Sequence, residues 1–169
     1  MITEEKQKSR GQSFVVYALG RMEKDHAFGA ALRRADNPAT EYQSWEYLAG
    51  FKVDLKNDAE RHAFTTIGAA LCRAKPTHSG SLGLGKSLFH CYESDAVDQG
   101  KAKLRRVLAC DTSEEVCQVL RPLLSLIASR PKTNLSYGRL LDDLLWFDID
   151  PQKVKVRWAQ DFFGRQAEE

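Results

Sequence analysis

The hydrophobic residues of this chain recur with a helical period along nearly its whole length. In residues 63–71, apolar side chains stand at positions 63, 64, 67, 70 and 71, and residues 116–127 repeat the spacing. Such spacing gathers apolar side chains on one face of a helix. Runs rich in valine and isoleucine, which a buried parallel sheet needs, do not occur in the sequence. The pattern therefore predicts an all-α protein without a significant sheet.

Capping residues and breaks divide the first half of the chain into helices. Asp25 is a candidate N-cap, Asn37-Pro38 is a break, and Asn57 with Glu60 forms a capping pattern. A polar loop at residues 75–81 separates the last two predicted helices of this half. We expect helices over residues 14–22, 26–35, 39–50, 58–74 and 83–91.

The second half is predicted to form four helices after a polar, acidic linker at residues 93–100. One covers residues 101–109, the next follows Thr112, the third covers residues 135–147, and the last begins at Pro151. Thr112-Ser-Glu-Glu115 is a capping box, and Pro151 suits the first turn of the last helix. Short helices joined by short loops are typical of antiparallel bundles. We therefore predict two small helical-bundle domains, an N-terminal one over residues 1–95 and a four-helix one over residues 96–169.

Composition adds an uneven distribution of charge. The chain has 169 residues, 43% hydrophobic and 28% charged, with a net charge of only +2. Between Arg61 and Tyr92, however, there is no Asp or Glu. The net charge alone does not indicate a nucleic-acid-binding protein. The absence of acidic residues between positions 61 and 92 nevertheless makes this region locally positive.

The segment from Gly80 to Ser87, Gly-Ser-Leu-Gly-Leu-Gly-Lys-Ser, matches the letters of a phosphate-binding P-loop. A P-loop follows a buried strand and opens into a helix. Here a helix, then a polar stretch containing Pro76, precedes the glycines. We therefore interpret the segment as a glycine-rich start of a helix with Lys86 in its first turns. A P-loop nucleotide-binding enzyme is the alternative.

Other chemistry has little support in the sequence. The four cysteines show no C-x-x-C spacing, so we expect reduced thiols, several of them in helix cores, and no metal site or cofactor. Asp142 and Asp143 point about 100° apart on a helix and are interpreted as a solvated face.

The sequence also bears on where the protein is found. Residues 1–13 lack the apolar part of a signal peptide, and no apolar run could span a membrane, which favours a cytoplasmic protein.

Basic residues at helical spacing are the better indication of function. Lys101 and Arg105 stand four positions apart, as do Lys153 and Arg157. Lys103 and Arg106 are three positions apart. Arg33 and Arg34 end a helix, where the helix dipole also favours them. Together these pairs favour a surface that contacts the phosphate backbone of nucleic acid with little regard to sequence.

The order of several segments resembles one family. Leu32-Arg33-Arg34 comes first, and the later ones are Leu84-Gly85-Lys86-Ser87-Leu88, Lys101–Arg106, Leu120-Arg121-Pro122-Leu123-Leu124, Tyr137-Gly138-Arg139-Leu140-Leu141 and Trp158-Ala159-Gln160-Asp161-Phe162. Over residues 12–163 the chain is similar to CasB, the small subunit of the type I-E CRISPR Cascade surveillance complex.

This resemblance implies a non-catalytic, two-domain helical protein in antiviral defence. Its partners would be the backbone and large subunits of Cascade, crRNA, and target DNA including the non-target strand, with two copies per complex. The family's basic motif positions correspond to Arg33, Arg34, Lys86, Arg121 and Arg139. Our own helix assignment adds Lys101, Lys103, Arg105, Arg106, Lys153 and Arg157. Pro122 stands where relatives can carry a second arginine.

Overall fold

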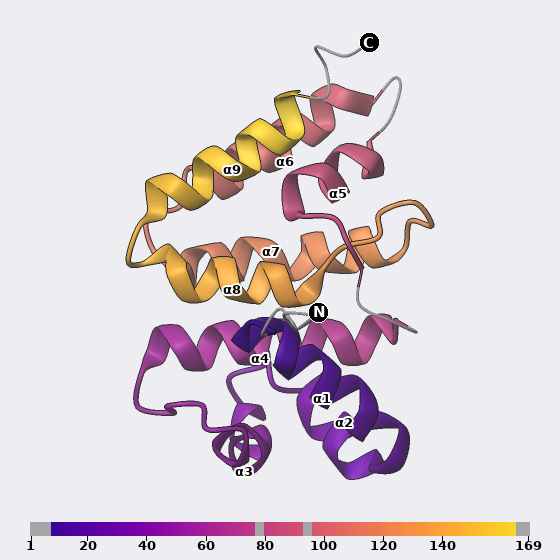
Figure 1. The fold of residues 1–169 in the computed structure, drawn as a ribbon, viewed down its shortest axis with the longest axis vertical. Coiled ribbons are helices and arrows are strands. Elements are labelled where there is room, and N and C mark those ends of the chain that lie inside the picture. The colour runs from indigo at the N-terminus through magenta and orange to yellow at the C-terminus, as the bar shows by residue number, and fades with distance from the viewer. Residues whose placement is uncertain (1–7, 77–79, 93–95, 165–169) are drawn as a thin grey trace, which may run out of the picture.

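The computed structural model describes residues 8–76, 80–92 and 96–164. Within these ranges every regular element is a helix, and the one extended pairing is an isolated parallel bridge between Leu82 and Leu135. The all-α prediction is confirmed (Figure 1). The elements are α1 (Arg10–Lys24), α2 (His26–Arg33), the 3₁₀ helix η1 (Glu41–Ser44), α3 (Trp45–Gly50), α4 (Asp58–Ala74), α5 (Leu84–Cys91), α6 (Val97–Leu108), α7 (Ser113–Ala128), α8 (Tyr137–Phe147) and α9 (Pro151–Phe163).

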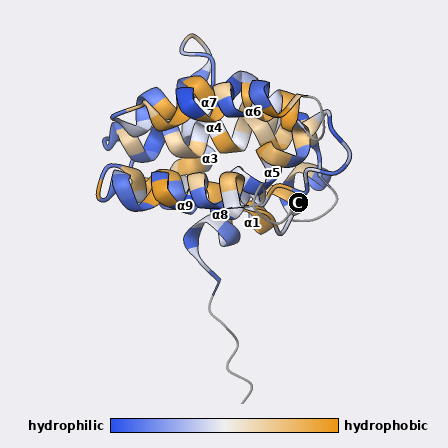
Figure 2. Cartoon of the chain, turned by 90° about the horizontal axis from the view of Figure 1, so that it is seen from above, coloured by the Kyte–Doolittle hydropathy of each residue, from blue (hydrophilic) through white to orange (hydrophobic). Residues whose placement is uncertain are grey.

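The helices stack in tiers along the long axis of the molecule (Figure 1). The N-terminal helices α1 to α4 form one end, α7 and α8 cross the middle, and α6 and α9 form the other end. Viewed from above, α4, α6 and α7 lie in one layer, and α1, α8 and α9 lie in the other (Figure 2). Contacts of α7 with α4 and of α8 with α1 join the middle tier to the N-terminal helices.

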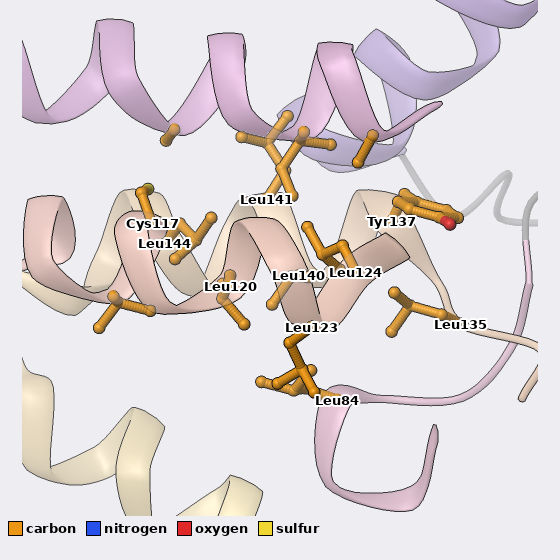
Figure 3. Packing of buried hydrophobic residues seen from close by; sticks show 14 of the residues in the cluster. Leu84, Cys117, Leu120, Leu123, Leu124, Leu135, Tyr137, Leu140, Leu141 and Leu144 are labelled. Atoms are coloured by element: carbon orange, nitrogen blue, oxygen red, sulfur yellow. The ribbon is translucent and has the colours of Figure 1, made fainter. Parts of the chain in front are cut away.

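The leucine-rich faces of α7 and α8 form the centre of the core (Figure 3). Leu120 and Leu124 of α7 and Leu141 and Leu144 of α8 are almost fully buried. Each such side chain contributes about 1.5–3 kcal/mol when it is removed from water. The two middle helices therefore bind the ends of the molecule together.

Buried residues connect through one hydrophobic cluster that runs from Phe14 to Phe162. Helix α5 precedes the predicted boundary between residues 95 and 96, yet it packs against α9 and α6. A helix of the first predicted domain thus packs on helices of the second. The division into domains of residues 1–95 and 96–169 stays a prediction.

Three predicted N-caps are confirmed. The carboxylate of Asp25 accepts a hydrogen bond from the backbone N–H of Phe28 at 3.1 Å. The Asn57 side chain accepts from Glu60 N–H at 3.1 Å, and Thr112 Oγ1 accepts from the Glu115 N–H at 3.2 Å. Each satisfies a backbone donor that has no partner within its helix.

Three element boundaries differ from the prediction. The helix expected from residue 135 begins at Tyr137, because Leu135 pairs with Leu82 and Ser136 takes the cap position. The helix expected over 39–50 opens with the 3₁₀ turn of η1. The predicted linker 93–100 was wrong over 97–100, which form the first turn of α6, and residues 93–95 lie outside the described ranges. Gly100 is buried against Tyr92 and Phe162, so tertiary packing stabilises a helical turn that the polar sequence does not suggest.

Candidate nucleic-acid interface

Helix α6 carries the densest group of predicted contact residues. Leu104 and Val107 are fully buried, and the opposite face turns outward. Lys103, Arg105 and Arg106 are exposed on that face, whereas Lys101 is half-buried with its Nζ 3.9 Å from an Asp98 oxygen. The first three have no ion pair within the described residues, so their charges are available to an external polyanion.

A groove of about 250 Å³ separates α6 from α7. Lys103 and Arg106 stand on its α6 side, and the apolar side chains of Val119, Leu123 and Leu126 line the α7 side. Pro122 lies inside α7 and has no N–H, so it breaks the helical hydrogen bond that would stabilise this turn. The groove thus has cations on one side and mainly apolar side chains on the other.

Arg33 and Arg34 end α2 and are both exposed, as expected. Arg34 Nε donates to the carbonyl of Ala30 at 3.1 Å. Behind them, the guanidinium of Arg73 donates to both carboxylate oxygens of Asp36 at 2.5 Å and to the Arg33 carbonyl at 3.1 Å. This bidentate pair fixes the turn after α2 and holds the two arginines at the surface.

Arg121 of α7 is half-buried rather than outward. It lies against α4 and the turn after α2, where it lines two small hollows together with Asp36. Its Nε is buried and has no hydrogen-bond partner. The side chain of Arg121 is therefore partly enclosed by α4 and the turn after α2, and its position in the sequence does not predict this burial.

The other candidates lie on different helices. Lys86 is half-buried on α5, and Lys153 is exposed on α9. Arg139 of α8 is exposed and flanks Gly83 together with Asp161. Helices α8 and α9 belong to the layer opposite α6 and α7 (Figure 2). Arg139, Lys153 and Arg157 thus lie on helices of a different layer from the cations of α6, although α9 also contacts α6.

Asp143 and Arg157 differ most from their predicted surroundings. The Asp143 side chain is 4% exposed and accepts from Arg157 Nη1 at 2.6 Å and from Trp158 Nε1 at 2.9 Å. Asp142 accepts from the Gly11 N–H at 2.8 Å. The solvated-face interpretation of both carboxylates was wrong, because α8 packs between α1 and α9 and each carboxylate meets a different neighbour. Arg157, expected outward, is half-buried in an ion pair.

Burial raises the pKa of the Asp143 carboxyl above its usual 3.8. The Trp158 hydrogen bond and the charges of Arg157 and Arg139 act in the opposite direction, and the charge of Asp142 adds to the rise. The pair has a structural role, since it joins α8 to α9.

A family comparison identifies the chain. The family model of the CRISPR-associated protein Cse2 matches residues 29–163. The chain belongs to the Cse2 family. No curated protein sequence matches it significantly.

Solved structures of Cse2 and CasB proteins share this fold. M. ruber CasB is 24% identical with a TM-score of 0.75, over 96% of this chain and 97% of that one. A Cse2-family protein from Thermus thermophilus is 22% identical with a TM-score of 0.74, over 93% and 99%. A chain of a CRISPR RNA-guided surveillance complex is 22% identical with a TM-score of 0.73, over 94% and 97%. The resemblance drawn from the sequence is confirmed.

In this Cse2 chain the P-loop-like glycines serve packing. A Cβ on Gly85 would lie 2.2 Å from the backbone oxygen of Trp158. The Ser87 hydroxyl, which a P-loop would turn to a magnesium ion, is buried and donates to the carbonyl of Thr133 at 2.9 Å. Helix α5 follows the isolated bridge at Leu82 rather than a strand. These contacts argue against the nucleotide-site alternative.

All four cysteines are buried and free. Cys72, Cys91 and Cys117 lie in helices, as expected for several of them, and Cys110 lies between α6 and α7. Burial raises the pKa of Cys72, Cys91 and Cys117 to about 11. Among the described residues, no group of three or more His, Cys, Asp or Glu side chains could hold a metal ion. No helix in the described ranges is long and apolar enough to cross a membrane.

Proposed function

We propose that this chain is the non-catalytic small subunit of a type I-E Cascade complex in cytoplasmic antiviral defence. The observation that supports the proposal most is the Cse2 family match over residues 29–163, together with the fold shared with a chain of a CRISPR RNA-guided surveillance complex. Its partners are the backbone and large subunits, crRNA, and target DNA including the displaced strand. Two copies enter each complex.

The proposed activity is to stabilise the R-loop through contacts with the nucleic-acid backbone. Opening a duplex against a guide RNA is nearly balanced in base-pair energy, so modest backbone contacts can decide the outcome. Lys103, Arg105 and Arg106 on α6 offer unpaired charges beside a groove, and Arg33 and Arg34 offer two more. A displaced single strand binds such electrostatic grooves.

A net charge of +2 limits what the free protein can do alone. Its affinity for nucleic acid is expected to be weak and to rise in the complex, where several surfaces act on one scaffold. Arg139 and Lys153 remain candidates for contacts on the opposite layer, and Lys86 on α5 is a further candidate. Arg157 is a weaker candidate because Asp143 already binds its guanidinium.

Assembly of the complex with and without this chain tests the proposal. The other subunits and crRNA are combined with target duplex, and the R-loop lifetime is measured by dissociation of a labelled displaced strand. The proposal expects a shorter lifetime when the chain is omitted. A helical adaptor without a DNA role would join the complex yet leave the lifetime unchanged, and that result would contradict the proposal.

A further inference from the structure

A polar hollow lies where α7 meets α4 and the turn that follows α2. It consists of two adjoining parts of about 140 and 260 Å³, which share Asp36 and Arg121. Glu114, Gln118 and Arg121 line the larger part from α7. These three residues stand at positions i, i+4 and i+7, so they share one face of the helix.

Most charges in the hollow are already neutralised. Arg73 binds Asp36 through both of its terminal nitrogens. Arg61 of α4 lies 3.3 Å from a Glu41 oxygen and 2.9 Å from an Asp58 oxygen. These pairs belong to the fold and leave no charge for a ligand.

Arg121 and Glu114 are the exceptions. Within the described residues neither side chain has an ion pair or a hydrogen bond, although both line the same hollow. The Nε of Arg121 is buried without a partner, and so is Nδ1 of His62 on the facing helix α4. A buried donor without an acceptor costs free energy, and native structures rarely leave one without a reason. This face of α7 therefore presents one half-buried cation, Arg121, and one exposed carboxylate, Glu114, neither of which has a partner among the described residues.

The balance of charge favours a protein ligand over a nucleic-acid strand. Around the two parts of the hollow, Arg61, Arg73 and Arg121 face an equal number of carboxylates, those of Asp36, Glu41 and Glu114. A phosphate backbone needs a net positive surface, and an unpaired Glu114 would repel it. A protein surface that carries both signs complements such a mosaic.

We propose that this hollow is a docking site for another protein subunit, in which Arg121 receives an aspartate or glutamate carboxylate of the partner. Glu114 receives a lysine or arginine of the same partner. Seven residues of helix separate the two by about 10 Å, so the partner presents opposite charges about two helical turns apart. The inference rests on the proposed role as a complex subunit, and it assigns Arg121 to assembly rather than to DNA.

The test compares assembly with nucleic-acid binding in the same variants. Arg121→Gln and Glu114→Gln are made in the full chain, and the other Cascade subunits and crRNA are supplied. At limiting concentration, the amount of each variant that enters the complex should fall about tenfold, the effect of about 1.4 kcal/mol. The affinity of each isolated variant for a single-stranded oligonucleotide should stay unchanged. Arg106→Gln should lower the affinity for the oligonucleotide and leave entry into the complex unchanged. Lys24→Gln, which removes an exposed charge elsewhere, should change neither the affinity nor the entry.

Thermal unfolding shows whether each variant is folded. Glu114 is exposed and makes no side-chain contact among the interactions above, so its variant tests the proposal even if Arg121→Gln is unstable. Entry of folded variants at the wild-type level would overturn the docking proposal alone. An oligonucleotide affinity lowered as much by Arg121→Gln as by Arg106→Gln would make the hollow a phosphate site and would also overturn it. If the wild-type chain stays outside the complex, the proposed function falls as well.

Discussion

Trp158 donates its indole N–H to the buried carboxylate of Asp143 at 2.9 Å and so ties α9 to α8. Its ring also stacks on Phe147, with centroids 6.0 Å apart. Asp143→Ala would leave this N–H without an acceptor inside the core. We expect the free energy of unfolding to fall by about 2–3 kcal/mol, measured by urea unfolding followed through tryptophan fluorescence.

Asp143→Asn serves as the conservative variant, because it keeps an acceptor for Trp158, and it should cost less than Asp143→Ala. Asp111→Ala is the surface control, since Asp111 is exposed, and it should stay within about 0.5 kcal/mol of wild type. Equal stability of wild type and Asp143→Ala would show that the hydrogen bond contributes nothing.

The same carboxyl predicts a pH dependence. Because burial raises its folded pKa above 3.8, the folded state holds the proton to higher pH than the unfolded state does. Wild-type stability relative to Asp143→Asn should therefore fall as pH rises from below 3.8 through the folded pKa. Unfolding free energies of both proteins across this range measure it. A relative gain for wild type would mean that the charge of Arg157 outweighs burial.

Gly85 allows α5 to approach α9. Gly85→Ala would place a methyl group 2.2 Å from a backbone oxygen of Trp158, which α9 can relieve only by moving. We expect a loss of about 2–3 kcal/mol in the free energy of unfolding. Gly20→Ala is the matched control, because it lies on an open face of α1 with nothing within 4 Å, and it should stabilise the protein by about 0.5–1 kcal/mol. Equal effects of the two variants would contradict this packing.

The cysteines should report on unfolding. Burial raises the pKa of Cys72, Cys91 and Cys117 to about 11, so few thiolates exist at neutral pH and a disulfide reagent should react slowly with the native protein. All four should react rapidly in denaturant. As pH rises above about 9, the unfolded thiols ionise before the folded ones, so stability should decline. Rapid reaction of the native protein would show that these sites open locally.

The sequence predicts the helices well because their signals are local. Asp25, Asn57 and Thr112 cap helices through bonds to residues three positions away, and such bonds are visible in the sequence. The start of α8 was missed because it depends on Leu82, which lies far away in the chain.

The surroundings of charged residues were harder to predict. Asp143 and Arg157 are fourteen positions apart, and only the packing of α8 against α9 brings them together. Spacing on one helix correctly predicts that Lys103 and Arg106 share a face. It does not predict that Arg121 turns towards α4, or that α8 and α9 lie in the opposite layer from α6.

The central claim is that the cations of α6 hold DNA in the assembled complex. The most direct test measures R-loop lifetime and DNA affinity against salt concentration for complexes that contain wild type or the double variant Lys103→Gln/Arg106→Gln. The control is Lys24→Gln/Lys56→Gln, which removes the same charge from exposed positions elsewhere. We predict that the α6 variant shortens the lifetime and lowers the slope of log affinity against log salt by about 1.4–1.8, the value for two lost phosphate contacts. The control should match wild type, and an α6 variant with the wild-type lifetime and slope would contradict the account.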